Sequence, residues 1–185
     1  MGMKTWHETI LGEIDAVLRG VKEEELHALC DRLHRAPAVF VAGEGRSGLM
    51  AKAFAMRLMH IGKNVFVVGE TIAPGIRPGD LLLAVSGTGE TETVCLYAGQ
   101  AKKAGASVVS ITSYPHSRIA GLSDFTVTIP AATKRRRAGE PATVQPLGNQ
   151  FDQCLHLALD YVAMEIAKSM DISHDAMASR HASLQ

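Results

Sequence analysis

The feature that most constrains the fold is a set of short apolar runs that alternate with longer helical patterns. The first run, 38–42, is continuously apolar and ends at Gly43, and comparable runs cover 65–68, 81–85, 107–112 and 125–129. A run without polar alternation predicts a strand that is buried on both faces. Strands that alternate with helices predict an α/β three-layer sandwich, here with a five-stranded parallel sheet flanked by helices.

The apolar residues outside these runs follow helical spacing. Two helices are predicted within residues 1–36, the second ending before Pro37, and two more over 46–61 and 90–103. After a loop rich in Gly, Pro and basic residues, a long helix is expected from about Leu147 to Ser169, with a tail that is helical in its first half. We expect one domain over 1–185: N-terminal helices in 1–36, the sheet core in 37–130, and a C-terminal helix and tail in 147–185.

The composition limits the partners. Lys plus Arg and Asp plus Glu are 19 each, so the charge balance favours neither nucleic acid nor a membrane surface. The basic run 134–137 is short and lacks interleaved aromatic residues, so we interpret it as a solvated loop. The three cysteines form no CxxC pair, and neither a metal site nor a disulfide framework is expected. Without a signal peptide or a membrane-spanning run, the protein is predicted to be cytoplasmic.

A first glycine loop, 43–48, follows the first predicted strand. It matches the G-x-G-x-x-G pattern of dinucleotide-binding proteins, and Glu70 lies where the ribose-binding acid would be expected. The chain is too short for a separate substrate domain, however, and two helices precede the first strand. The dinucleotide interpretation is therefore the weaker one, but it stays open.

A second loop follows the third predicted strand and carries three hydroxyl groups and two glycines. If Glu90 opens the next helix, the free N–H groups of that helix would attract a phosphate. The loop lacks the lysine of a nucleotide-binding P-loop. A simple helix cap would explain only one of the hydroxyls. The predicted phosphate-binding residues are Ser86, Gly87, Thr88, Gly89, Glu90 and Thr91.

Together, these two loops resemble those of the sugar isomerase (SIS) domain family. Within that family the sequence is similar to the 6-phospho-3-hexuloisomerases over nearly the whole chain. The most specific stretch is 42–60, and the segments 68–70, 145–148 and 181–182 add to it.

The resemblance implies an activity and an assembly. It implies interconversion of D-arabino-hex-3-ulose 6-phosphate and D-fructose 6-phosphate, in the ribulose monophosphate pathway of formaldehyde assimilation, without metal or organic cofactor. It also implies a homotetramer with sites near subunit boundaries, and a role for Ser47 in substrate binding. Arg46, between Gly45 and Ser47, is placed to meet a phosphate or sugar oxygen, although a solvated arginine at a helix start is as good an account.

Three residues are candidates for proton transfer. Asp152 stands where the family usually has Glu in Phe-Glu-Gln, and by resemblance it is the proton acceptor; a plain helix-start acid is the alternative. His60 and His181 are equal candidates for polarising the carbonyl or opening the sugar ring. The family tail commonly ends in Glu, whereas this chain ends in Gln185.

Two other functions stay open at this point. One is a different SIS isomerase that acts on an aldose-ketose phosphate pair. The other is a phosphosugar-sensing module without chemistry, which the Asp152 and Gln185 departures allow.

Overall fold

The structure is a computed structural model that describes residues 5–181 and 183. Its helices are α1 (Trp6–Leu18), α2 (Glu23–Arg35), α3 (Gly45–Ile61), α4 (Glu92–Lys103), α5 (Arg118–Leu122), α6 (Asn149–Ser169) and α7 (His174–Ala178). Its strands are β1 (Val39–Gly43), β2 (Val65–Val67), β3 (Leu81–Val85), β4 (Ser107–Thr112) and β5 (Phe125–Thr128). All strand pairs are parallel, in the order β2-β1-β3-β4-β5.

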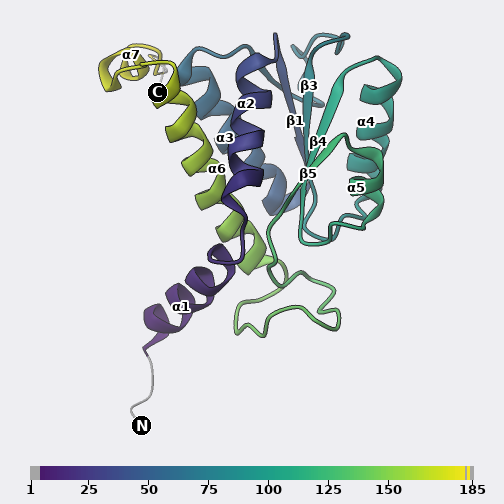
Figure 1. The fold of residues 1–185 in the computed structure, drawn as a ribbon, viewed down its shortest axis with the longest axis vertical. Helices are drawn as coiled ribbons and strands as arrows, with labels where there is room; N and C mark the ends of the chain where they lie inside the picture. The colour runs from purple at the N-terminus through teal and green to yellow at the C-terminus, as the bar shows by residue number, and fades with distance from the viewer. Residues whose placement is uncertain (1–4, 182, 184–185) are drawn as a thin grey trace.

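Helices cover both faces of the sheet, which confirms the predicted three-layer sandwich. Helices α2, α3 and α6 lie against one face and α4 and α5 against the other, while α1 extends beyond the body of the molecule (Figure 1). Each face has its own buried cluster, one centred on Phe54, Phe151 and Leu155 and the other on Phe40, Leu82 and Val108. Burial from both sides is the reason that the strands are continuously apolar.

The strand order creates one switch point in the sheet. The chain goes from β1 outwards to β2 and then returns to β3 on the other side of β1. Gly43, Val85 and Ile111 are aligned in the register of β1, β3 and β4, so the segments that follow these strands emerge at the same edge. In open parallel sheets, ligands bind in the crevice outside the carboxyl ends of the strands at this point. Both loops singled out in the sequence therefore meet at the expected place.

The predicted elements are confirmed with small shifts at their ends and two differences. Helix α4 begins at Glu92 and not at Glu90, because Thr91 is its N-cap residue with an extended backbone. Helix α5 was not predicted from the sequence, because five residues show too little periodicity.

The segment 131–146 has neither helix nor strand, as predicted, and it lies beside the start of α6 (Figure 1). Among the helices that the structure describes, none has the length and apolar character needed to cross a membrane.

Candidate functional site

A cavity of about 350 Å³ lies at the switch point between β1 and β3. Four segments form its walls: the loop after β1, the loop after β3, the first turn of α6 and the chain after β5. Its lining residues are Glu44, Gly45, Arg46, Ser47, Val85, Ser86, Gly87, Thr88, Thr91, Thr133, Lys134, Leu147, Gly148, Phe151 and Asp152. The structure thus brings together most of the site residues that the sequence predicts.

The hydroxyl-rich loop after β3 is held in shape by its own side chains. The Oγ of Ser86 accepts a hydrogen bond from the Gly89 N–H at 3.1 Å and lies 2.8 Å from the Thr91 Oγ1. The Thr88 Oγ1 accepts from the Glu90 N–H at 3.3 Å. Thr91 makes no side-chain cap bond to α4, so the cap alternative does not explain its hydroxyl.

Two consecutive backbone N–H groups in this loop are left to bind a ligand. Those of Gly87 and Thr88 donate no hydrogen bond to any residue that the structure describes. Both residues line the cavity. Consecutive N–H groups of this kind form a concave site for an anion, so the arrangement suits a phosphate.

Gly89 is required by both its conformation and its surroundings. Its φ is +70°, in the left-handed region that side chains disfavour. A Cβ at this position would lie 2.1 Å from the Ser117 Oγ. Gly89 does not line the cavity. It therefore contributes to the conformation of the loop and not to the surface that a ligand would contact.

Glu90 is also outside the cavity. Its Oε1 accepts a hydrogen bond from the Arg118 N–H at 3.3 Å, at the start of α5. The carboxylate thus lies on the side of the loop that faces α5. The sequence predicted that Glu90 contacts the substrate, but Glu90 does not line this cavity.

Asp152 projects from the first turn of α6 into the cavity, opposite the start of α3. The Ser47 Oγ donates to its Oδ1 at 2.6 Å, and the Arg46 Nε lies 3.4 Å from its Oδ2. Its side chain is only 6% exposed. Burial raises the pKa of Asp152 above its ordinary value, against the lowering effects of Ser47 and Arg46. A carboxyl with a raised pKa and a fixed orientation is suited to acid/base chemistry.

His60 and His181 lie together but away from this cavity. Their rings stack with centroids 5.3 Å apart, and His60 is buried at the last turn of α3. Ser47 is in the first turn of the same helix, so His60 is about 20 Å further along its axis at 1.5 Å per residue. Burial lowers the pKa of His60, and His181 and Arg57 lower it further, which favours the neutral ring. In this chain, neither histidine lines the cavity that contains Asp152.

Apart from Asp152, the lining residues that follow β5 or lie around the start of α6 were not singled out as site residues in the sequence: Thr133, Lys134, Leu147, Gly148 and Phe151. A signal for the first two was available, because the chain that follows β5 must also emerge at the carboxyl edge of the sheet. Nothing in the sequence pattern showed that this long loop would turn back toward the β3 loop.

The first glycine loop is explained by packing. A Cβ on Gly48 would lie 2.4 Å from the carbonyl oxygen of Gly43, so this glycine allows α3 to approach β1. Glu70 forms an ion pair with Lys52, with 2.9 Å between Oε1 and Nζ. Both features of the dinucleotide interpretation thus have another structural role.

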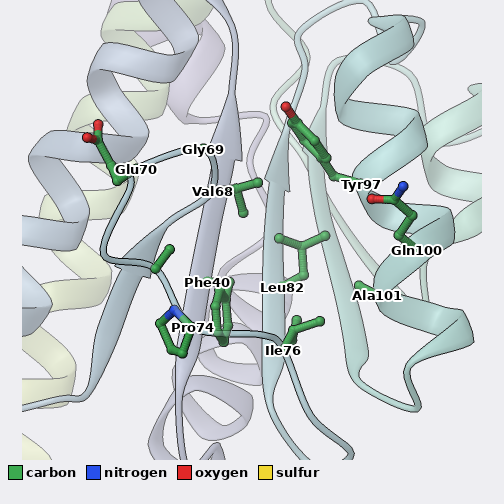
Figure 2. A pocket seen from close by; sticks show the side chains of 11 residues that line it. Phe40, Val68, Gly69, Glu70, Pro74, Ile76, Leu82, Tyr97, Gln100 and Ala101 are labelled. Carbon is green, nitrogen blue, oxygen red and sulfur yellow. The ribbon is translucent and has the colours of Figure 1, made fainter.

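A second cavity, of about 260 Å³, lies on the other face of the sheet beside α4. Its floor is apolar, from Phe40, Leu82 and Ile76, and Tyr97 and Gln100 project from α4 at its rim (Figure 2). Glu70 is its one charged lining residue, and no basic side chain lines it. The cavity therefore does not suit a phosphate.

No three His, Cys, Asp or Glu side chains in residues 5–181 and 183 are grouped so that they would hold a metal ion. The three cysteines are free thiols, and Cys95 and Cys154 are buried.

Comparison with known proteins identifies the family to which this chain belongs. The sequence pattern of the SIS domain matches residues 32–144, which include β1 to β5 and the loops after β1 and β3. The chain belongs to the SIS domain family.

Relatives of this SIS protein match over most of their length. It is 37% identical over 176 residues to the 3-hexulose-6-phosphate isomerase of Bacillus subtilis, which covers 95% of both chains. It is 41% identical over 165 residues to the enzyme of the same name from Mycobacterium gastri, covering 89% of this chain and 82% of that one. A crystal structure of a hypothetical protein from Methanococcus jannaschii, for which a molecular function of 3-hexulose-6-phosphate isomerase was inferred, has a TM-score of 0.84 at 29% identity. That match covers 96% of this chain and 98% of the other.

Proposed function

We propose that this SIS protein interconverts D-arabino-hex-3-ulose 6-phosphate and D-fructose 6-phosphate, a step of the ribulose monophosphate pathway. The observation that carries the proposal is the position of Asp152, whose buried carboxyl faces the same cavity as the hydroxyl-rich loop after β3. The names of the Bacillus subtilis and Mycobacterium gastri relatives support the choice of substrate.

The reaction moves a carbonyl from C3 to C2 of the sugar through an enediol. Asp152 removes the proton from C2 and returns a proton to C3, and a second group transfers protons between the two oxygens. The substrate phosphate binds the N–H groups of Gly87 and Thr88 and the hydroxyls of the loop. Fixing the phosphate at one end of the cavity places the reacting carbons beside the carboxyl, and such positioning supplies much of the rate.

The contacts of Asp152 account for an Asp in place of the usual family Glu. Its two oxygens are engaged by Ser47 and Arg46, both at the start of α3. These contacts hold the shorter side chain in one orientation within the cavity. We therefore place Ser47 and Arg46 around the base, where Arg46 is also within reach of sugar oxygens.

We further propose that the protein works as a cytoplasmic homotetramer in which His60 and His181 serve the cavity of a neighbouring subunit. Within one subunit these histidines are too far from Asp152 to act on the same sugar. Helices α3 and α6 carry exposed apolar side chains that would pack against a second copy: Leu49, Met56, Met59, Leu157 and Met164. Gln185, which stands where the family tail commonly has Glu, lies outside the described residues.

The deciding experiment is turnover of hex-3-ulose 6-phosphate to fructose 6-phosphate by purified protein without added metal. Asp152→Asn is the matched variant, because it keeps the size and the hydrogen bond of the side chain but removes the base. We expect turnover by the wild type, and a fall of at least about a hundredfold in the variant, which still binds fructose 6-phosphate.

Other substrates distinguish the alternatives. A panel of aldose and ketose phosphates tests a different SIS isomerase. Stabilisation by fructose 6-phosphate with no turnover of any member of the panel would identify a sensing module instead. Full activity of Asp152→Asn would place the base elsewhere.

A further inference from the structure

The chain after β5 crosses the carboxyl edge of the sheet and adds Thr133 and Lys134 to the wall of the cavity. Thr133 is 1% exposed, whereas Lys134 is exposed. An exposed lysine on a solvated loop samples many positions and contributes little to binding. The contribution of Lys134 therefore depends on how firmly the backbone around it is held.

The backbone on both sides of Lys134 is anchored. Before it, the Ala132 N–H donates to the Gln150 Oε1 at 2.7 Å, at the start of α6. The Thr133 N–H donates to the Glu140 Oε2 at 2.8 Å. After it, the Arg135 N–H donates to the Thr133 Oγ1 at 3.2 Å. Lys134 thus starts from a fixed point at the rim of the cavity.

Glu140 is the centre of this anchor. Besides the Thr133 N–H, it accepts from the Thr133 Oγ1 and from the hydroxyl of Tyr114, which follows β4. Burial alone would raise the pKa of Glu140, but these hydrogen bonds lower it overall and keep the carboxylate charged. Arg137 stacks over the ring of Tyr114, with its guanidinium carbon 4.4 Å from the centroid. The loop after β5 is therefore attached to the loop after β4.

A second carboxylate holds the far end of the same loop. Glu13 of α1 accepts hydrogen bonds from the Thr143 hydroxyl, the Val144 N–H and the Gln145 side-chain amide. The segment 131–146 is thus fixed at both ends, by Gln150 and Glu140 near its start and by Glu13 near its end.

The charges in the cavity leave Lys134 without a carboxylate partner. The basic lining residues are Arg46 and Lys134, and the acidic ones are Glu44 and Asp152. Arg46 pairs with Asp152, and Glu44 accepts a hydrogen bond from the Thr93 hydroxyl. None of the ion pairs between the described residues includes Lys134. A sugar phosphate brings about −1.5 to −2 charges at pH 7, and the hydroxyls and amides of the β3 loop carry no full positive charge.

We propose that Lys134 pairs with the phosphate of the bound sugar, so that the loop after β5 completes a phosphate site begun by the loop after β3. The inference rests on the proposed function for the identity of the ligand. The lysine binds the phosphate equally in substrate and transition state, so its contribution is to affinity. It also makes the site selective for phosphorylated sugars.

The test compares Lys134→Met with Arg135→Met. Both variants remove one exposed positive charge from the same loop, but only Lys134 lines the cavity. Calorimetric titration with fructose 6-phosphate and with inorganic phosphate at low ionic strength measures binding, and inorganic phosphate reports it without turnover. We expect Lys134→Met to weaken both by about ten- to a hundredfold, as for a lost charge-assisted hydrogen bond, and Arg135→Met to change them by less than about twofold.

Kinetics and a conservative variant complete the design. Lys134→Met should raise KM with little change in kcat, since uniform binding is removed, and Lys134→Arg should restore much of the affinity. Circular dichroism and melting temperature establish that each variant is folded. Equal binding of both ligands by wild type and Lys134→Met would overturn the inference while leaving the isomerase proposal intact. Weaker binding in Lys134→Met, with no turnover by wild type, would reject the isomerase proposal and retain the phosphate contact.

Discussion

At the scale of single residues, the surroundings of Asp152 set the pH range in which the base is available. Burial raises its pKa, so the carboxylate form required for C2 deprotonation is lost on acidification at a pH above the ordinary value for Asp. The acid limb of kcat/KM should accordingly lie above 3.8, the unperturbed value. A pH–rate profile of the wild type measures it directly.

Ser47→Ala should move the acid limb of the kcat/KM profile to higher pH. The Ser47 hydroxyl donates to the charged carboxyl, and its removal destabilises the anion, so the limb moves to higher pH. The variant also loses the contact that orients the base, and we expect kcat/KM at neutral pH to fall about tenfold or more. Ser47→Thr keeps a hydroxyl and should stay closer to wild type. A limb that moves to lower pH in Ser47→Ala would mean that the hydroxyl does not stabilise this carboxylate.

At the scale of elements, the loop between β3 and α4 depends on one backbone conformation. Gly89→Ala would be strained in two ways. Alanine would have to adopt a φ of +70°, and its Cβ would lie 2.1 Å from the Ser117 Oγ. We expect it to lower the free energy of unfolding by about 2 kcal/mol or more. For a domain of this size the melting temperature should fall by at least about 4–8 °C.

Gly99→Ala in the next helix is the matched control for Gly89→Ala. Gly99 lies within α4, and a Cβ there would have open space around it. Its replacement should leave stability unchanged or raise it by about 0.5–1 kcal/mol, from helix propensity. Similar melting temperatures for the two variants would show that the left-handed turn at Gly89 is not a constraint.

The elements also show how far the sequence determines the site. Apolar runs predicted all five strands, because strands buried on both faces have a distinct pattern. The loop 86–91 was predicted because glycines and hydroxyls are local signals. The hydrogen bond from Ser47 to Asp152 joins residues 105 apart in the sequence, and no local pattern encodes such a contact. The same holds for Lys134, whose place at the cavity depends on hydrogen bonds of the neighbouring backbone to Glu140 and Gln150.

For the whole molecule, the two groups of candidate catalytic residues lie at opposite ends of α3. Asp152 and Ser47 are at the carboxyl edge of the sheet. His60 is in the last turn of α3, where it stacks with His181 and its carbonyl accepts a hydrogen bond from Arg180. Helix α7, which precedes Arg180, lies where α6 ends (Figure 1). If each active site combines Asp152 of one subunit with His60 of another, two inactive variants should complement each other. Asp152→Asn and His60→Ala, each inactive alone, should regain activity when they are unfolded and refolded together in equal amounts.

Symmetry gives the expected size of this recovery. With random assortment, about a quarter of the sites receive both functional side chains, so about a quarter of wild-type activity should return. Each variant refolded alone is the control, and light scattering measures the assembly, which we expect to be a tetramer. The stacked, neutral His60 ring would then donate to or accept from sugar oxygens across the subunit boundary, while Asp152 moves the proton between carbons. No recovery in correctly assembled hybrids, or full activity of His60→Ala, would leave His60 as a buried packing residue at the end of α3.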